Sequence, residues 1–310
     1  MTIQEEIRQI CREKNAIIMA HYYCRPEVQD IADYIGDSLA LARQAQKTDA
    51  DIIVLCGVHF MAETAAILCP SKKVLIPDAS AGCSLADSCK AEDLKAWKDA
   101  HPDYQVISYV NTSAAVKALT DIVVTSSNAL KIVSSFPRDA KLLFGPDRNL
   151  GAYINGETGR HMELWNGGCH VHGRFSIEAL MTMKEEHPGV PVLAHPECKQ
   201  IILNQSDMIG STQALLNYAK EHTEHKQFII ATEPGVIHKM QEARPDATFL
   251  SVPPEETEGI GCSCNECEYM RMNTLEKVLR CLQDEQPVVT VDTAIAPLAL
   301  RPIEKMLQSC

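Results

Sequence analysis

The sequence predicts an α/β fold of three units, each a four-stranded parallel sheet flanked by helices, related by a pseudo-threefold axis. Short apolar runs of strand length alternate along the chain with segments of helical periodicity. This alternation is typical of parallel strands joined by crossover helices. The same order of elements then occurs three times. An internal repeat of this kind indicates three copies of one structural unit.

The first unit shows the order of elements most clearly. An amphipathic helix is expected over 3–14, followed by a strand over 16–20 that ends at His21. Pro26 suits the first turn of the next helix, where its missing N–H is not needed. After that helix, which ends near residue 32, we expect a strand at 34–38, a helix at 39–46, a strand at 51–55, a helix at 59–68 and a strand at 73–77.

Motif residues with constant spacing define the repeat. The first strands of the units end near three residues that are 88 and 86 positions apart (109 − 21 and 195 − 109): His21, Tyr109 and His195. A hydroxyl residue expected to open a helix follows each by 17 positions (38 − 21, 126 − 109 and 212 − 195): Ser38, Ser126 and Thr212. Five positions before each hydroxyl (38 − 33, 126 − 121 and 212 − 207) lies an acid, interpreted as a structural cap or turn former: Asp33, Asp121 and Asp207.

The repeat also predicts the other strands and the unit boundaries. Third strands are expected at 52–55, 142–144 and 228–231, and fourth strands at 74–76, 162–164 and 248–252. The first unit is predicted to span 1–85, the second 86–171 and the third 172–285. The C-terminal segment 286–310, with a strand at 288–291 and a helix at 302–308, is expected to pack back on the first unit.

Composition excludes several classes of partner. The net charge is −12, and no basic cluster is present, which argues against nucleic acid as a partner. No apolar run approaches the roughly 18 residues of a membrane span, and the N-terminus lacks a signal-peptide pattern. The expectation is a cytoplasmic protein without a membrane partner. Thirteen cysteines in such a chain indicate reduced thiols with metal or redox roles rather than disulfides.

The strand ends and helix starts predict a pocket for an anion. In open parallel sheets, ligands bind beyond the carboxyl ends of the strands, where the following helices begin. Helix N-termini favour phosphate or carboxylate groups. The pocket is therefore expected to combine the three hydroxyls above with residues at the strand ends: His21, Tyr109, Asn111, His195 and Glu197. The alternative for each single hydroxyl is an ordinary N-cap.

A cysteine follows the fourth strand of every unit: Cys83, Cys169 and the group Cys262, Cys264 and Cys267. A structural zinc site takes four ligands, so three distant thiolates fit it poorly. A [4Fe-4S] cluster held by three cysteines leaves one iron free to act as a Lewis acid. Taken alone, the spacing Cys262-x-Cys264-x-x-Cys267 also fits a zinc knuckle or a redox pair.

Several motifs between about residues 15 and 280 resemble the quinolinate synthase A family of NAD biosynthesis. They are His21-x-Tyr23, the segment 26–33, Gly36-Asp-Ser38, the segment 60–64, Tyr109-Val-Asn111, the segments 125–129 and 144–147, Cys169-x-Val-His172 and His195-Pro-Glu-Cys198. The resemblance implies a triangle of three domains around a central active site with one [4Fe-4S] cluster per chain. It also implies condensation of iminosuccinate with dihydroxyacetone phosphate to quinolinate, and a functional link to the L-aspartate-oxidising enzyme that supplies iminosuccinate.

Site residues follow from the matching motifs. The resemblance implies that the cluster ligands are Cys83, Cys169 and Cys267. It implies substrate contacts at His21, Ser38, Tyr109, Val110, Asn111, Ser126, His195, Pro196, Glu197 and Thr212. Among these types, Glu197 suits a catalytic base, Tyr23 and Tyr109 suit proton donors, and His21 and His195 suit groups that orient carboxylates.

The sequence departs from the family pattern in its last cysteine group. Many members have Cys-x-x-Cys-x-x-Cys followed by Pro, whereas Glu268 follows Cys267 here. Cys262 and Cys264 therefore have no assured role, and Cys89 is a second thiol close to Cys83. Two other functions stay open at this point: a different [4Fe-4S] hydro-lyase, and a noncatalytic zinc or redox-sensing protein.

Overall fold

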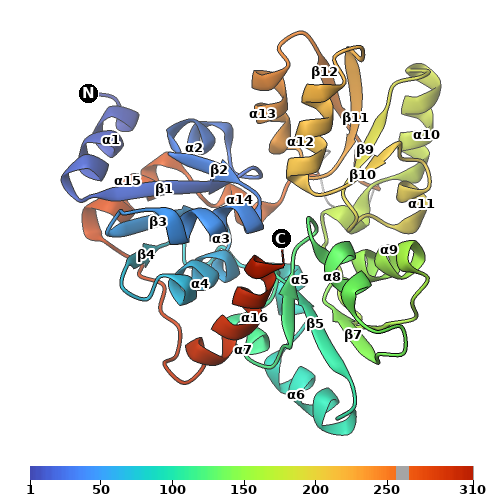
Figure 1. Ribbon diagram of the computed structural model, residues 1–310. Helices are drawn as coiled ribbons and strands as arrows, with labels where there is room; N and C mark the ends of the chain where they lie inside the picture. The colour runs from blue at the N-terminus through green and yellow to red at the C-terminus, as the bar shows by residue number, and fades with distance from the viewer. Residues whose placement is uncertain (256–264, 310) are drawn as a thin grey trace.

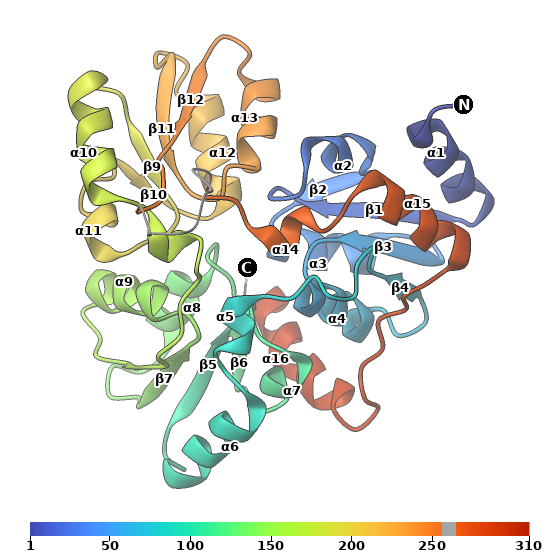
Figure 2. The same cartoon turned by 180° about the vertical axis from the view of Figure 1, so that it is seen from behind.

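Three four-stranded sheets surround a common centre in the computed structural model, which describes residues 1–255 and 265–309 (Figure 1). All strand pairs within the sheets are parallel. The three units form a triangle around this centre (Figures 1 and 2). The predicted fold class and the threefold repeat are therefore confirmed.

The strands have the same spatial order in every unit: second, first, third, fourth. In the first sheet they are β2 (Tyr34–Gly36), β1 (Ala16–His21), β3 (Ile52–Cys56) and β4 (Lys73–Leu75). In the second they are β6 (Ile122–Val124), β5 (Gln105–Tyr109), β7 (Leu142–Gly145) and β8 (Glu163–Leu164). In the third they are β10 (Met208–Ile209), β9 (Val192–Ala194), β11 (Gln227–Ala231) and β12 (Thr248–Ser251). The predicted third and fourth strands are all present, with ends shifted by two residues at most.

A helix precedes or follows every strand, which is why the sheets are parallel. The first unit contains α1 (Ile3–Glu13), α2 (Pro26–Ile31), α3 (Ser38–Lys47) and α4 (His59–Leu68). After α5 (Ser84–Asp87), the second contains α6 (Ala91–Ala100), α7 (Ala114–Lys117), α8 (Ala129–Ser135) and α9 (Arg148–Thr158). After the 3₁₀ turn η1 (His172–Arg174), the third contains α10 (Ile177–Glu186), α11 (Gln200–Leu203), α12 (Thr212–Glu221) and α13 (Val236–Ala243).

The repeated acids are structural, but they join strands and do not cap helices. In each unit one carboxylate oxygen accepts the backbone N–H of a residue in or beside the first strand. The distances are 2.8 Å for Asp33 to Ile18, 2.7 Å for Asp121 to Val106 and 2.8 Å for Asp207 to Val192. The N–H of each acid donates in return to the carbonyl of the same partner, at 2.8, 3.0 and 2.9 Å. This reciprocal pair fixes the entry to the second strand beside the first.

We expect Asp207→Ala to lower the free energy of unfolding by about 1–3 kcal/mol, because the N–H of Val192, a fully buried residue, loses its acceptor. Asp207→Asn is the matched control, since its amide oxygen still accepts this N–H. Urea denaturation of both variants checks the prediction. Equal losses in the two variants would contradict the role given to the acceptor oxygen.

The C-terminal segments pack across the unit boundaries. Helix α14 (Glu268–Arg271) leads into α15 (Leu275–Asp284), which packs on α1 and β3, although the predicted boundaries place it in the third unit. A single antiparallel bridge between Leu75 and Val288 replaces the strand expected at 288–291. Helix α16 (Ala296–Gln308) contacts β6 and α7 of the second unit as well as α4 of the first (Figure 2). The expected packing on the first unit thus describes only part of this segment.

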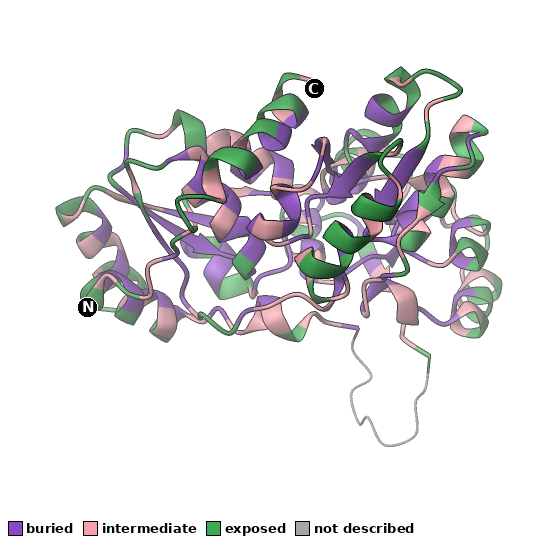
Figure 3. Cartoon of the chain, turned by 90° about the horizontal axis from the view of Figure 1, so that it is seen from below, coloured by how far each residue is buried: buried purple, intermediate pink, exposed green. Residues whose placement is uncertain are grey.

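Helix α16 also begins earlier than predicted. A proline stands in its first turn, where the missing N–H costs nothing, and Pro302 lies within the helix. Elsewhere burial follows the sheets: the strands are mostly buried and the outward faces of the helices are exposed (Figure 3). Among the described residues, none of the helices has the length and apolar character needed to cross a membrane.

Candidate active site

A cavity with about 710 Å³ of space between its atoms lies where the carboxyl ends of the strands of all three units meet. The sequence-predicted residues that line it are His21, Tyr23, Ser38, Cys83, Tyr109, Val110, Asn111, Ser126, Cys169, His195, Glu197, Thr212 and Cys267. Pro196 lies instead in a neighbouring cavity, which shares Asp37 and Ser126 with the first. The structure thus brings together residues that are far apart in the chain, while the role of each stays a prediction.

The hydroxyls of the repeat are not N-caps. Asp37 caps α3 by accepting the N–H of Ala40 at 3.0 Å, and Ser211 caps α12 by accepting that of Ala214 at 3.3 Å. Ser38 and Thr212 are the first helical residues after these caps, and both line the cavity. The capping alternative is therefore wrong for these two.

Ser126 departs from the repeat. Helix α8 begins three positions later, at Ala129, so the prediction that Ser126 opens a helix is wrong. Asn128 accounts for the difference, because its side-chain oxygen accepts the N–H of Thr125 at 2.7 Å and closes a turn before the helix. The Ser126 hydroxyl still faces the site, 3.2 Å from Nε2 of His195.

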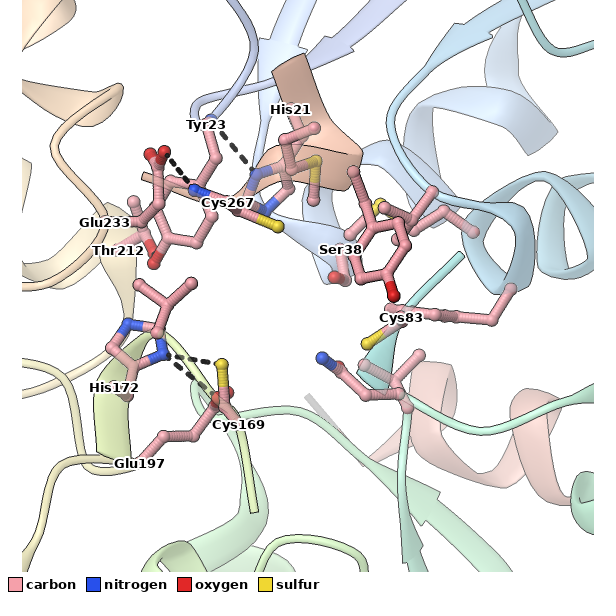
Figure 4. Close-up of a pocket in the computed structure, with 18 of the residues that line it drawn as sticks. His21, Tyr23, Ser38, Cys83, Cys169, His172, Glu197, Thr212, Glu233 and Cys267 are labelled. Carbon is pink, nitrogen blue, oxygen red and sulfur yellow. Dashed lines mark hydrogen bonds and ion pairs between the residues drawn. The ribbon is translucent and has the colours of Figure 1, made fainter. Parts of the chain in front are cut away.

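Three thiols, one from each unit, face the centre of the cavity (Figure 4). Cys83 and Cys267 precede α5 and α14, and Cys169 lies just before η1. These three are partly exposed, whereas the other described cysteines are buried. Cys89 is one of the buried thiols and packs beside Leu94 outside the cavity. Cys262 and Cys264 lie outside the described residues.

The three sulfur atoms are not grouped as closely as the ligands of a single ion. Among the described residues, the sulfur atoms of Cys83, Cys169 and Cys267 do not all lie within 4.8 Å of one another. Zinc–sulfur bonds of about 2.3 Å would hold sulfur atoms closer together than this. Burial raises the pKa of Cys83 to about 12 and that of Cys267 to about 11. Coordination ionises a thiol outright, so these side chains suit metal ligands better than free nucleophiles.

Two buried carboxylates hold the backbone of two of these cysteines. Oδ2 of Asp147 accepts the N–H of Cys169 at 2.9 Å, and Oε1 of Glu233 accepts that of Cys267 at 3.2 Å. Burial raises the pKa of both carboxyl groups to about 7. Asp147 follows β7, the third strand of the second unit, and Glu233 follows β11, the third strand of the third unit. The second and third units therefore position their thiols in the same way.

A chain of side-chain hydrogen bonds crosses the wall of the cavity. Its contacts are Tyr109 to Glu197 at 2.6 Å, Glu197 to His172 at 3.1 Å, His172 to Thr232 at 3.0 Å, Thr232 to Tyr23 at 2.8 Å and Tyr23 to Thr212 at 2.6 Å. It connects the expected base to both expected proton donors and includes residues of all three units. Figure 4 shows Cys169 beside His172, whose Nδ1 is 3.3 Å from the sulfur atom.

Glu197 sets the direction of this chain. Burial raises its pKa, but the contacts with His172 and the Tyr109 hydroxyl outweigh burial and hold the pKa below the usual value, so the carboxylate is ionised. An ionised carboxylate only accepts, so Nδ1 of His172 carries the proton that lies between the two side chains. The two donors next to Glu197, the Tyr109 hydroxyl and this N–H of His172, therefore both point toward the carboxylate.

Two histidines and two tyrosines of the wall are uncharged. Burial lowers the pKa of both His21 and His195 to about 3, so their imidazoles are neutral at neutral pH. Burial also raises the pKa of Tyr23 and Tyr109 well above its ordinary value, which keeps their hydroxyls protonated. Neutral imidazoles and protonated phenols can bind carboxylates as hydrogen-bond donors without adding charge.

Sequence reasoning gave no site role to His172, Thr232, Asp147 or Glu233. The first lies in the motif Cys169-x-Val-His172, and the other three directly follow the third strands of their units. His21, Tyr109 and His195 lie at the carboxyl ends of the first strands. Asp147, Thr232 and Glu233 have the same position relative to the third strands, which is a sequence signal for a site role.

The chain is similar to known proteins of one family over nearly its whole length. The family model described as "Quinolinate synthetase A protein" matches residues 5–308. A protein of Synechococcus sp. named quinolinate synthase is 52% identical over 301 residues, covering 97% of this chain and 93% of that protein. A protein of the same name from Chloroherpeton thalassium is 51% identical over 305 residues, covering 98% and 93%. A third, from Thermosynechococcus vestitus, is 52% identical over 302 residues, covering 97% and 93%.

Proposed function

Because the chain belongs to the quinolinate synthetase A protein family, we propose that it condenses iminosuccinate with dihydroxyacetone phosphate to quinolinate, phosphate and two waters. The observation that carries this proposal is the meeting of three thiols, an ionised carboxylate and two protonated tyrosines in one cavity. An enzyme that oxidises L-aspartate would supply the iminosuccinate.

The thiol set fits a [4Fe-4S] cluster held by Cys83, Cys169 and Cys267. The three partly exposed thiols face one space, their sulfur atoms do not all lie within 4.8 Å of one another, and the backbone N–H groups of Cys169 and Cys267 are held by buried carboxylates. When bound, such a cluster supplies an open iron that assists the departure of hydroxyl groups as a Lewis acid.

Donors around the cavity would bind the carboxylates of iminosuccinate. Helices α3 and α12 begin at its wall, and helix N-termini favour anions. Ser38, Ser126 and Thr212 add hydroxyl donors, and the neutral rings of His21 and His195 add N–H donors. No lysine or arginine is among the described residues that line the cavity. Binding would therefore depend on directional hydrogen bonds.

Glu197 is the proposed base for removal of a substrate proton. Its carboxylate is ionised and lines the cavity, and it receives hydrogen bonds from Tyr109 and His172. The carboxylate would hold this proton at the point where the chain of side-chain hydrogen bonds runs from Glu197 through His172 and Thr232 to Tyr23.

Replacing Tyr23 with phenylalanine would break this chain between Thr212 and Thr232. We expect kcat to fall by roughly 10–100-fold, because one proton-transfer group is lost while the cavity keeps its shape. The matched control is Tyr22→Phe, since the hydroxyl of Tyr22 bonds Gln213 outside the cavity. Turnover close to wild type in Tyr23→Phe would remove this residue from the scheme.

Anaerobic purification and an assay test the proposed function. We expect a brown protein with about four iron and four sulfide per chain that forms quinolinate from iminosuccinate and dihydroxyacetone phosphate. A cluster without quinolinate formation would favour a different hydro-lyase. A colourless protein with stoichiometric zinc would favour a zinc or redox-sensing role, and either result would overturn the proposal.

A further inference from the structure

A lysine with a fully buried side chain lies under the loop that carries Tyr109 and Asn111. Lys117 is the last residue of α7, and its Nζ donates to the carbonyl oxygens of Val110, at 2.7 Å, and Thr112. Among the described residues, no carboxylate lies within 4.0 Å of this ammonium group. Among the described residues, Lys117 therefore donates to backbone carbonyls and forms no ion pair.

In the first unit a different buried side chain donates to two backbone carbonyls in the same way. Gln29 follows His21 by the same eight positions that separate Lys117 from Tyr109 (29 − 21 and 117 − 109). Nε2 of Gln29 donates to the carbonyls of Tyr22 at 2.9 Å and Cys24 at 2.8 Å. These carbonyls are one and three positions after the motif residue, as are those that Lys117 binds.

The third unit has no hydrogen-bond donor at the equivalent position. Leu203 stands at the equivalent position (203 − 195), is nearly buried and has no polar side-chain atom. The turn after β9 is held from the neighbouring unit instead, where Nδ2 of Asn149 donates to the carbonyl of Glu197 at 2.9 Å. A leucine thus fills the same space, so packing alone does not require Lys117 or Gln29.

Both donors also reach a second unit. Nε2 of Gln29 donates at 3.0 Å to the carbonyl of Gly235, whose missing Cβ would stand 2.8 Å from Cα of Tyr23. Nζ of Lys117 lies 5.3 Å from the centre of the Phe60 ring, which lines the active-site cavity. Each donor therefore links a turn of its own unit to a residue of another unit.

These groups are costly to bury. Burial lowers the pKa of Lys117 to about 7, and Oε1 of Gln29 is buried without a hydrogen-bond partner among the described residues. The orientation of the Gln29 amide is nevertheless determined, because its three neighbours are carbonyls and accept only. A neutral lysine amine and a glutamine amide each offer two N–H donors, so the two residues can perform the same task.

We propose that Gln29 and Lys117 are equivalent positioning residues that hold the turns after β1 and β5 and so direct Tyr23 and Asn111 into the active site. This inference rests on the proposed function for its kinetic consequence. Its structural part, the fixing of the two turns by a buried donor, does not depend on the reaction.

The test compares Lys117→Met, which keeps the length but removes the donors, with Lys117→Gln, which copies the first unit. Hydrogen exchange of a peptide covering 105–113, the KM for iminosuccinate, kcat and bound iron are measured in both. In Lys117→Met we expect the amides of 110–112 to exchange at least tenfold faster and KM to rise about tenfold, with iron unchanged. Lys117→Gln should restore exchange and KM to within about threefold of wild type.

Two outcomes would overturn the inference: wild-type exchange and KM in Lys117→Met, or a Lys117→Gln variant that behaves like Lys117→Met. If Lys117→Met does not fold, Gln29→Met and Gln29→Lys make the same comparison for residues 21–24. If the wild-type enzyme forms no quinolinate, the proposed function fails, but the exchange measurement still decides whether these donors fix the turns.

Discussion

Alanine in place of Cys83, Cys169 or Cys267 will abolish quinolinate formation and leave the anaerobically purified protein with little bound iron. Loss of a group that only supports a metal ligand typically costs about 10–100-fold in affinity, so loss of the ligand itself should cost at least as much. The effect should be similar for the three variants, because each unit contributes one thiol to the same cavity. Iron and sulfide analysis of the purified variants checks the result.

Cys89→Ala is the control for the first unit. Cys89 is close to Cys83 in sequence, but it is buried outside the cavity, so this variant should keep its iron. Cys262→Ala and Cys264→Ala are the controls for the third unit, although both residues lie outside the part of the chain that the structure describes. Iron retained in Cys267→Ala but lost in Cys264→Ala would move the ligand assignment to Cys264.

Glutamine in place of Glu197 will lower kcat by about 10²–10⁴-fold, the usual contribution of a general base. The substitution keeps the size of the side chain and its hydrogen bond from Tyr109, but it removes the ionised group that accepts the substrate proton. Iron content and the KM for iminosuccinate should change little. Steady-state kinetics under anaerobic conditions, with iron measured on the same samples, test this expectation.

Glu233→Gln is the contrasting variant. Glu233 is also a buried acid of the cavity, but its oxygen accepts the N–H of Cys267 rather than belonging to the chain around Glu197. We expect weaker iron binding, by about 10–100-fold, as for other groups that support a metal ligand. A Glu197→Gln variant that loses iron but keeps its turnover per iron would exchange the roles given to these two acids.

The spacing of the motif residues along the sequence predicted the three-unit architecture, because one structural unit is repeated along the chain. His21, Tyr109 and His195 occur at nearly equal intervals, so a rule for one unit applied to all three. Spacing could not reveal which side chain meets which. The same interval selected Ser38 and Ser126, yet Asn128 closes a turn that delays the helix only after Ser126.

Contacts between units escaped prediction for a different reason. Thr232 and His172 join Tyr23 to Glu197 because the first and third units pack together, and no local pattern encodes that packing. Helix α15 likewise follows the third unit in sequence but packs on α1. Its buried stripe, which includes Val278 and Leu282, predicts that the helix packs against something, but gives no information about the partner.

The three thiols come from three separate units, so the binding of a ligand depends on how these units are assembled. A group held by Cys83, Cys169 and Cys267 together binds only when all three units are docked, so its binding free energy stabilises the docked arrangement by thermodynamic linkage. Each sheet, by contrast, forms its hydrogen bonds and its reciprocal aspartate pair within its own unit. Loss of the bound group should therefore loosen the units from one another before it unfolds any one of them.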